Sequence, residues 1–215
     1  MQITRRLGLM LMAALMLGQA SAVELTRDQA LRGLGQADGG VRLTAVQRLA
    51  QVGGMADTEQ LAALLADTDA AVGEAAEAAL WEIWSRSGDA EVDQLLERGV
   101  QQMQALALDQ ALGTFDLVVR RKPDFAEGWN KRATVYFLLG RHAESLQDCD
   151  EVLKRNRHHF GALSGAAQIH LKQGRVERAL DFFRRALEVN PNLRGAQQMI
   201  PLLEEHLRDK ARRTV

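Results

Sequence analysis

Residues 160–193 read FGALSGAAQIHLKQGRVERALDFFRRALEVNPNL, and this stretch decides the fold. Gly174 stands near its middle, between two segments with helical patterns, and Pro191 stands near its end. Glycine allows the chain to reverse because it enters left-handed conformations without a steric penalty, and proline ends a helix because it cannot continue the hydrogen bonding. The stretch therefore predicts two antiparallel helices joined by a short turn.

The same pattern recurs at a spacing of about 34 residues, and self-similarity at a fixed spacing is the signature of a repeat architecture. Gly140 and Gly174 lie one such spacing apart, and Pro123 and Pro191 lie two spacings apart. Small residues recur where the two helices of a unit would cross: Gly99, Ala133 and Ala167, then Ala111, Ser145 and Ala179. The spacing predicts three blocks at residues 92–125, 126–159 and 160–193. Leu106 stands where the first block should have its turn glycine, so the first turn is expected to be less ideal.

These blocks resemble the tetratricopeptide (TPR) repeat, whose period is also about 34 residues. The resemblance covers residues 92–193 of the chain. It implies an all-α fold, a right-handed α-solenoid of stacked helix-turn-helix repeats, and a concave groove that holds partners. The groove residues that the resemblance implies are Leu96, Val100, Met103, Asn130, Lys131, Thr134, Phe137, Gln168, Leu171 and Lys172. An extended or helical peptide would fit this mixture of apolar and polar residues.

Some members of this family hold the C-terminal carboxylate of heat-shock chaperones in a clamp of lysine, arginine and asparagine side chains. The corresponding residues here are Leu96, Val100, Lys131, Gly161 and Gly165, of which only Lys131 is charged. The single lysine has none of the other partner groups that the clamp needs to hold a carboxylate, so we do not expect binding of that kind.

The front segment, residues 23–91, carries a second and shorter period. The residues Leu34, Asp38, Val41, Ala45, Leu49 and Val52 return, at one constant offset, as Leu65, Asp69, Val72, Ala76, Leu80 and Ile83. This segment resembles the HEAT-like repeats, although Gly73 stands where many such repeats have an arginine. Asp69 is expected to cap a helix. The alternative is a generic helical cap for the TPR array.

Trp81 and Trp84 are close in sequence, on one face of the last front helix. We expect them to cover the seam to the first TPR helix, so that the two arrays stack as one continuous solenoid. The alternative is an exposed aromatic binding patch. At the other end, residues 194–215 are expected to form a capping helix and a basic tail.

Residues 1–22 have the pattern of a secretory signal peptide. Arg5 and Arg6 precede an apolar stretch, and Ala20 and Ala22 form a cleavage motif of small residues. The apolar stretch is shorter than the roughly 20 residues that span a bilayer, so a retained anchor is the weaker alternative. We therefore expect an exported protein, periplasmic or secreted, with no membrane span in the mature chain. Sec-type export is favoured over the twin-arginine route.

The sequence shows no motif for catalysis, a cofactor or a metal. His158 and His159 are adjacent in a turn between blocks and are expected to be solvated, and His170 is expected to pack between helices. Cys149 is the single cysteine, so no internal disulfide can form, and its register with Phe115 and Phe183 indicates a buried residue. Residues 23–91 carry an acidic excess and no concentrated basic face, which argues against nucleic acid as a partner.

The sequence thus predicts a non-catalytic, exported adaptor that binds a protein or peptide in its groove. A structural subunit that self-associates through an acidic front and a more basic rear is the alternative. The oligomeric state, the partner's identity and the pathway stay open.

Overall fold

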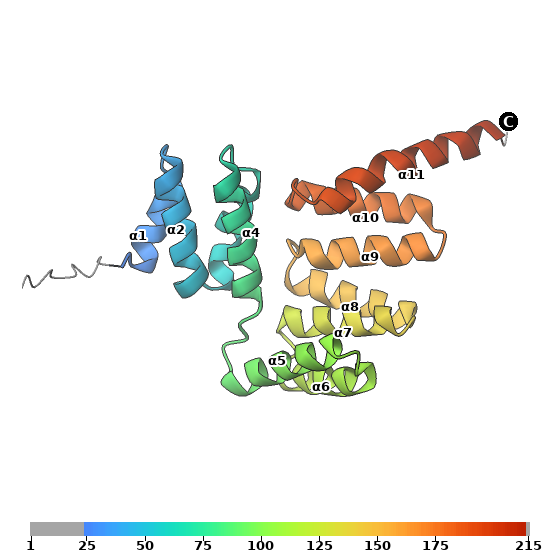
Figure 1. The fold of residues 1–215 in the computed structure, drawn as a ribbon, viewed down its shortest axis with the longest axis horizontal. Helices are drawn as coiled ribbons and strands as arrows, with labels where there is room; N and C mark the ends of the chain where they lie inside the picture. The colour runs from blue at the N-terminus through green and yellow to red at the C-terminus, as the bar shows by residue number, and fades with distance from the viewer. Residues whose placement is uncertain (1–23, 214–215) are drawn as a thin grey trace, which may run out of the picture.

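The computed structural model describes residues 24–213, and within that range every regular element is helical. The front segment contains α1 (Arg27–Gly33), α2 (Gly39–Val52), η1 (Met55–Asp57), α3 (Thr58–Ala63), η2 (Leu64–Ala66) and α4 (Ala70–Trp84). The repeats contain α5 (Ala90–Gln104), α6 (Leu108–Arg121), α7 (Ala126–Leu138), α8 (His142–Arg155), α9 (Phe160–Lys172) and α10 (Val176–Val189), and α11 (Arg194–Arg213) follows. The predicted all-α repeat solenoid is confirmed, while the expected signal peptide lies outside the described residues (Figure 1).

The repeat period sets the positions of the helices. The second helices α6, α8 and α10 start at positions 108, 142 and 176, and α7, α9 and α11 start at positions 126, 160 and 194, so each series advances by the same step. Gly140 and Gly174 reverse the chain with φ angles of 73° and 69°. Leu106 adopts a φ of 58° at the same turn, which is the less ideal turn that the sequence predicts.

The helices of each repeat cross where the sequence provides a small residue. A Cβ atom at Gly99 would lie 2.5 Å from the ring of Phe115, which is fully buried. At the equivalent crossing in the next repeat, the Ser145 hydroxyl donates a hydrogen bond of 2.7 Å to the Ala133 carbonyl oxygen. Larger side chains at these positions would separate the helices.

Two helical hairpins, α1 with α2 and α3 with α4, make up the front segment. The Asp69 carboxylate accepts a hydrogen bond of 3.0 Å from the Ala71 N–H, so the predicted cap of α4 is present, and Asp38 caps α2 in the same way. The Arg42 guanidinium binds both carboxylate oxygens of Asp67, at 2.7 and 2.8 Å. This bidentate pair ties α2 to the turn before α4.

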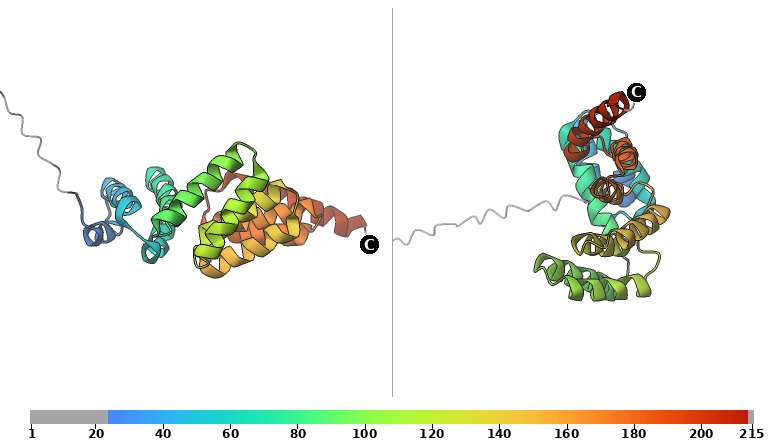
Figure 2. Two further views of the ribbon diagram at one scale, coloured as in Figure 1. Left: turned by 90° about the horizontal axis from the view of Figure 1, so that it is seen from below. Right: turned by 90° about the vertical axis from the view of Figure 1, so that its right-hand side faces the viewer.

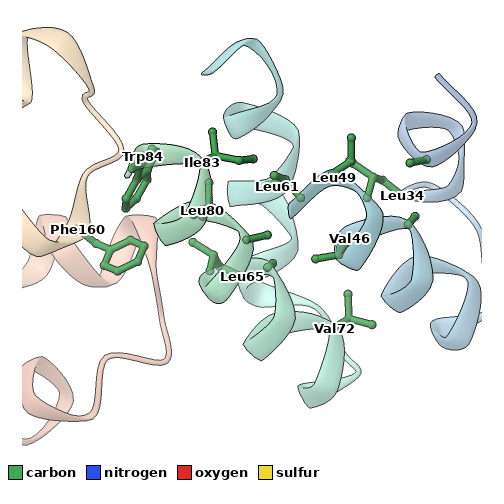
Figure 3. Packing of buried hydrophobic residues seen from close by; sticks show 14 residues of the cluster. Leu34, Val46, Leu49, Leu61, Leu65, Val72, Leu80, Ile83, Trp84 and Phe160 are labelled. Atoms are coloured by element: carbon green, nitrogen blue, oxygen red, sulfur yellow. The ribbon is translucent and has the colours of Figure 1, made fainter. Parts of the chain in front are cut away.

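The front segment folds back against the TPR array at the turns between repeats, beside α8, α9 and α10 (Figures 1 and 2). Trp81 and Trp84 contact Phe160, the first residue of α9, with ring centres 5.2 and 5.1 Å apart. Phe160 thereby joins the core of the front segment, where Figure 3 shows it beside Trp84. The expectation that the two tryptophans cover the seam to the first TPR helix is therefore wrong, because their rings contact His159 and Phe160, where the second repeat meets the third.

Polar contacts extend this interface along the same edge of the array. Glu77 accepts a hydrogen bond of 2.9 Å from the Asn190 side chain, and the Leu65 carbonyl accepts one of 2.6 Å from Asn192. Asn190 is fully buried. At the opposite face of the array's last unit, α11 packs Leu203 against α10, and its outer side is mostly polar, although Pro201 and Leu202 are exposed there.

Candidate functional site

The first helices of the three repeats, α5, α7 and α9, form one face of the array, and a hollow lies on each side of α7. The hollow between α7 and α9, called here the α7–α9 hollow, has a volume of about 270 Å³. Its sides include Asn130, Thr134, Phe137, Leu138 and Gln168. Thr134, Leu138 and Gln168 are exposed, so their side chains are available to a partner.

The second hollow, called the α5–α7 hollow, lies where the connection after α4 meets α5. Its volume is about 540 Å³, and its lining includes Ser85, Leu96, Val100 and Lys131. This second hollow is wide and shallow, and Leu96, which forms part of it, is only 6% exposed because it packs in the core of the first repeat.

The structure divides the ten predicted groove residues among three settings. Asn130, Thr134, Phe137 and Gln168 line the α7–α9 hollow, while Leu96, Val100 and Lys131 line the α5–α7 hollow. Met103 and Leu171 are half-buried against the cores of the first and third repeats, and Lys172 is exposed at the end of α9. The role of these residues in partner binding stays a prediction.

The floor of the α7–α9 hollow contains residues that the sequence analysis did not assign to a site. Ser145 and Cys149 reach it from α8, and Ile169 reaches it from α9. Burial raises the pKa of the Cys149 thiol to about 12, and Asp148 and Asp150 act in the same direction, so the thiol stays neutral. The floor is therefore uncharged. The sequence signal for this floor is the pair of small residues at positions 133 and 145, because they leave space between the helices.

A buried carboxylate lies beside this hollow. Glu127 of α7 is fully buried, and its oxygens contact His159 Nε2 at 2.9 Å, Asn130 Nδ2 at 3.0 Å and Lys131 Nζ at 2.8 Å. Burial alone would raise the pKa of Glu127, but the His159 hydrogen bond and the Lys131 charge outweigh burial and lower it. Asn130 and Lys131 thus stabilise the fold as well as facing the hollows.

His159 differs from its expected position. It is fully buried, and its Nδ1 accepts a hydrogen bond of 3.1 Å from the Ala162 N–H, so it caps α9. Nε2 therefore carries the proton that is donated to Glu127. The Trp84 ring stacks on the imidazole, with centres 4.6 Å apart. The repeat register contains a signal for this burial. Apolar residues, Phe125 and Leu193, occupy the position equivalent to His159 in the blocks before and after it.

Arg132, on the other side of α7, links the second repeat to the first through salt bridges. Its guanidinium binds Asp148 of α8 through two contacts of 2.8 Å and Asp116 of α6 through another of 2.8 Å. The hydrogen bonds that Arg132 donates to Asp148 raise the pKa of Arg132, whereas burial raises the pKa of Asp148. Three helices from two repeats therefore share one cation.

Residues 24–213 include no group of three His, Cys, Asp or Glu side chains placed to hold a metal ion. Within the same range, no helix combines the length and the apolar character needed to cross a membrane.

Stacked helical hairpins with hollows along one face define a scaffold of the protein-interaction class. The tetratricopeptide repeat family profile matches residues 124–192, and the chain contains tetratricopeptide repeats. The matched segment covers the second and third repeats.

Two curated relatives share part of the chain. A TPR repeat-containing protein of Rhizobium etli is 36% identical over 124 residues, which is 58% of this chain and 61% of the relative. DnaJ homolog subfamily C member 3 of Homo sapiens is 31% identical over 104 residues, which is 48% of this chain and 21% of that protein. The chain therefore covers less than two-thirds of the length of either relative.

Solved structures share the fold. The first TPR of Spaghetti (RPAP3), bound to the HSP90 peptide SRMEEVD, superposes with a TM-score of 0.52 at 23% identity and covers 54% of this chain and 92% of that chain. The MamA protein superposes with a TM-score of 0.52 at 18% identity and covers 74% of this chain and 88% of that chain.

Proposed function

We propose that this protein is a non-catalytic adaptor that binds a protein or peptide partner on the face formed by α5, α7 and α9. The observation that carries the proposal is the α7–α9 hollow, whose rim residues Thr134, Leu138 and Gln168 are exposed above an uncharged floor. The TPR domain of Spaghetti (RPAP3) in its complex with an HSP90 peptide, and that of yeast Sti1 in its complex with pHsp70, have a similar fold. They support a protein or peptide as the partner.

Two residues that could serve in catalysis have structural roles instead. Cys149 is a buried neutral thiol, and His159 caps α9 while it donates to Glu127. His159 is enclosed, and Cys149 reaches the floor of the hollow only as a nearly buried neutral thiol, so neither group is placed to act as a nucleophile or a base. This supports the non-catalytic part of the proposal.

The proposal includes export, with residues 1–22 as a cleaved signal and the mature chain periplasmic or secreted. Its support is the sequence pattern of Arg5, Arg6 and the small residues at 20 and 22. N-terminal sequencing of the protein recovered from envelope and medium fractions tests it. A chain that begins at Val23 in either fraction is expected, and an intact chain confined to the cytoplasm would contradict export.

We also assign the front segment to the HEAT-like repeats. The support is the constant offset in sequence that relates α2 to α4, with Asp38 and Asp69 as equivalent caps. Within this assignment, Arg42 fixes the two units through Asp67, and Gly73 lies where a Cβ atom would meet the Leu65 carbonyl at 3.3 Å.

The test of the adaptor function compares variants in an affinity capture from envelope extract with quantitative mass spectrometry. The double variant Leu138→Asp, Gln168→Arg changes exposed residues of the hollow and leaves the Glu127 network intact. Leu117→Asp, on α6 and 40% exposed, is the matched control. A partner should be recovered by the parent and the control and lost with the double variant. Equal recovery by all three proteins would contradict binding at this hollow.

A further inference from the structure

The α7–α9 hollow is closed on the side that faces the front segment. The Trp81 ring lies against Gly161, where a Cβ atom would be 2.6 Å from ring atom Cη2, and Gly161 is part of the wall of the hollow. The Lys131 ammonium lies 6.0 Å from the centre of the same ring and is paired with Glu127. At this end, therefore, the Trp81 indole fills the space, and the charge of Lys131 is already paired with Glu127 of the same chain.

The opposite side of the hollow is open and basic. Leu138 is 49% exposed, and the Lys172 ammonium lies 5.4 Å from the centre of the Phe137 ring. Among the described residues, Lys172 has no carboxylate within the 4.0 Å that defines an ion pair. Its positive charge is thus available at the rim, above an apolar surface.

Two further cations, Arg175 and Arg178, follow α9 at the start of α10. Burial lowers the pKa of His170, and Arg175 and Arg178 lower it further, while Asp150 acts in the opposite sense. These two arginines also form no ion pair among the described residues. Within the described part of the chain, Lys172 over the Phe137 ring is thus the unpaired positive charge beside the hollow, and it favours an acidic partner.

The size and chemistry of the hollow indicate what enters it. Its volume of about 270 Å³ is below the roughly 300–1,000 Å³ of pockets that hold whole small ligands. The Ser145 hydroxyl proton is already donated to Ala133, and the Cys149 thiol is neutral, so the floor offers little to a charged group. A hollow of this kind suits one bulky apolar side chain of a larger partner.

We propose that the partner is a protein segment that inserts one bulky apolar side chain into the α7–α9 hollow and places an aspartate or glutamate carboxylate against Lys172, with no need for a free C-terminus. This rests on the adaptor function proposed above. It specifies the chemistry of the bound segment and the direction from which it enters.

The test uses random dodecapeptides displayed on phage at the N-terminus of a coat protein, so that their C-termini are not free. The peptides are selected on the full mature protein and counted by sequencing. Expected peptides carry Leu, Ile, Phe or Trp together with Asp or Glu. The selected peptides are then synthesised with amidated C-termini and titrated against the parent protein and against variants.

Lys172→Gln should weaken these amidated peptides about two- to fivefold, and Lys172→Glu should weaken them further, because the carboxylate loses its cation. Arg120→Glu, an exposed charge reversal on α6, should leave affinity unchanged. Three outcomes would overturn this proposal alone. They are selected peptides without acidic residues, equal affinity of the peptides for Lys172→Glu and for the parent, and binding only with a free C-terminal carboxylate. Peptides that bind the Leu138→Asp, Gln168→Arg variant as tightly as the parent, or a selection that yields no peptide, would overturn the adaptor function as well.

Discussion

Leu106 is the one described residue other than glycine with a positive φ angle. It occupies the turn that Gly140 and Gly174 make in the later repeats, and its side chain is 76% exposed. A residue with a Cβ atom in the left-handed region costs roughly 1–2 kcal/mol relative to glycine. Leucine gains no burial here that would offset the cost, so the first repeat has a locally strained turn.

Replacing Leu106 with glycine should therefore stabilise the protein. We expect Leu106→Gly to raise the free energy of unfolding by about 1 kcal/mol, since the strain is removed and the larger freedom of the unfolded chain offsets only part of the gain. Urea denaturation followed by circular dichroism measures this value. Leu106→Ala keeps the Cβ atom and should stay close to the parent, and an equal gain from both variants would show that the turn is not the cause.

At the scale of the elements, one carboxylate joins α7 to the start of α9. Glu127 extends from α7 to His159, which caps α9, and Lys131 completes the pairing from the same helix as Glu127. The front segment closes over this network through Trp84, which stacks on the imidazole. The register of two repeats and the docking of the front segment thus depend on the same group.

The lowered pKa of Glu127 predicts a specific loss of stability in acid. Because the pKa of Glu127 is below its ordinary value of 4.5 in the folded protein, its contribution is present above that pH and is lost as the pH falls through the folded-state pKa. Glu127→Gln should cost about 1.5–3 kcal/mol of unfolding free energy at pH 7, the range for hydrogen bonds to charged groups. The cost should shrink as the pH falls below about 4.5.

Urea denaturation of the parent and Glu127→Gln at a series of pH values measures this difference. Glu205→Gln, which removes an exposed carboxylate from α11, is the control and should follow the parent throughout. A Glu127→Gln cost that is the same at pH 3 and at pH 7 would show that the carboxylate is not the charged partner in the network.

At the scale of the whole molecule, the sequence predicts the features that recur in every repeat, but it does not predict contacts that occur only once. The helix boundaries, the strained turn at Leu106 and the burial of Cys149 follow from the TPR period because equivalent residues share an environment. The contact of Trp81 and Trp84 with Phe160 does not follow, because it joins two different arrays and no internal repeat encodes it.

The candidate site also combines predicted and unpredicted features. Thr134, Phe137 and Gln168 line the hollow from positions that the repeat assigns to the groove, whereas the pairing of Lys131 with the buried Glu127 does not follow from the repeat. The acidic front lies against the turns of the array within one chain, and the Glu59–Arg157 pair at 2.9 Å joins them. Both of these side chains are exposed, so packing rather than charge holds the front segment in place.

Two glycines of α9 test this docking, since they differ in little except their distance from the front segment. A Cβ atom at Gly161 would lie 2.6 Å from the Trp81 ring, whereas one at Gly165 would lie 3.9 Å from the Cys149 sulfur, an ordinary contact. Alanine improves helix propensity at both positions, by about 1 kcal/mol in the helix interior at Gly165 and by less at Gly161 in the first turn of α9. Gly161→Ala should nevertheless be less stable than Gly165→Ala by roughly 1–3 kcal/mol, because the indole must move.

Small-angle X-ray scattering should show a larger radius of gyration for Gly161→Ala alone, together with a shift in tryptophan fluorescence as Trp81 and Trp84 gain exposure to water. If both variants match in stability, scattering and fluorescence, the front segment does not dock on α9, and the closed end of the α7–α9 hollow would be open in solution.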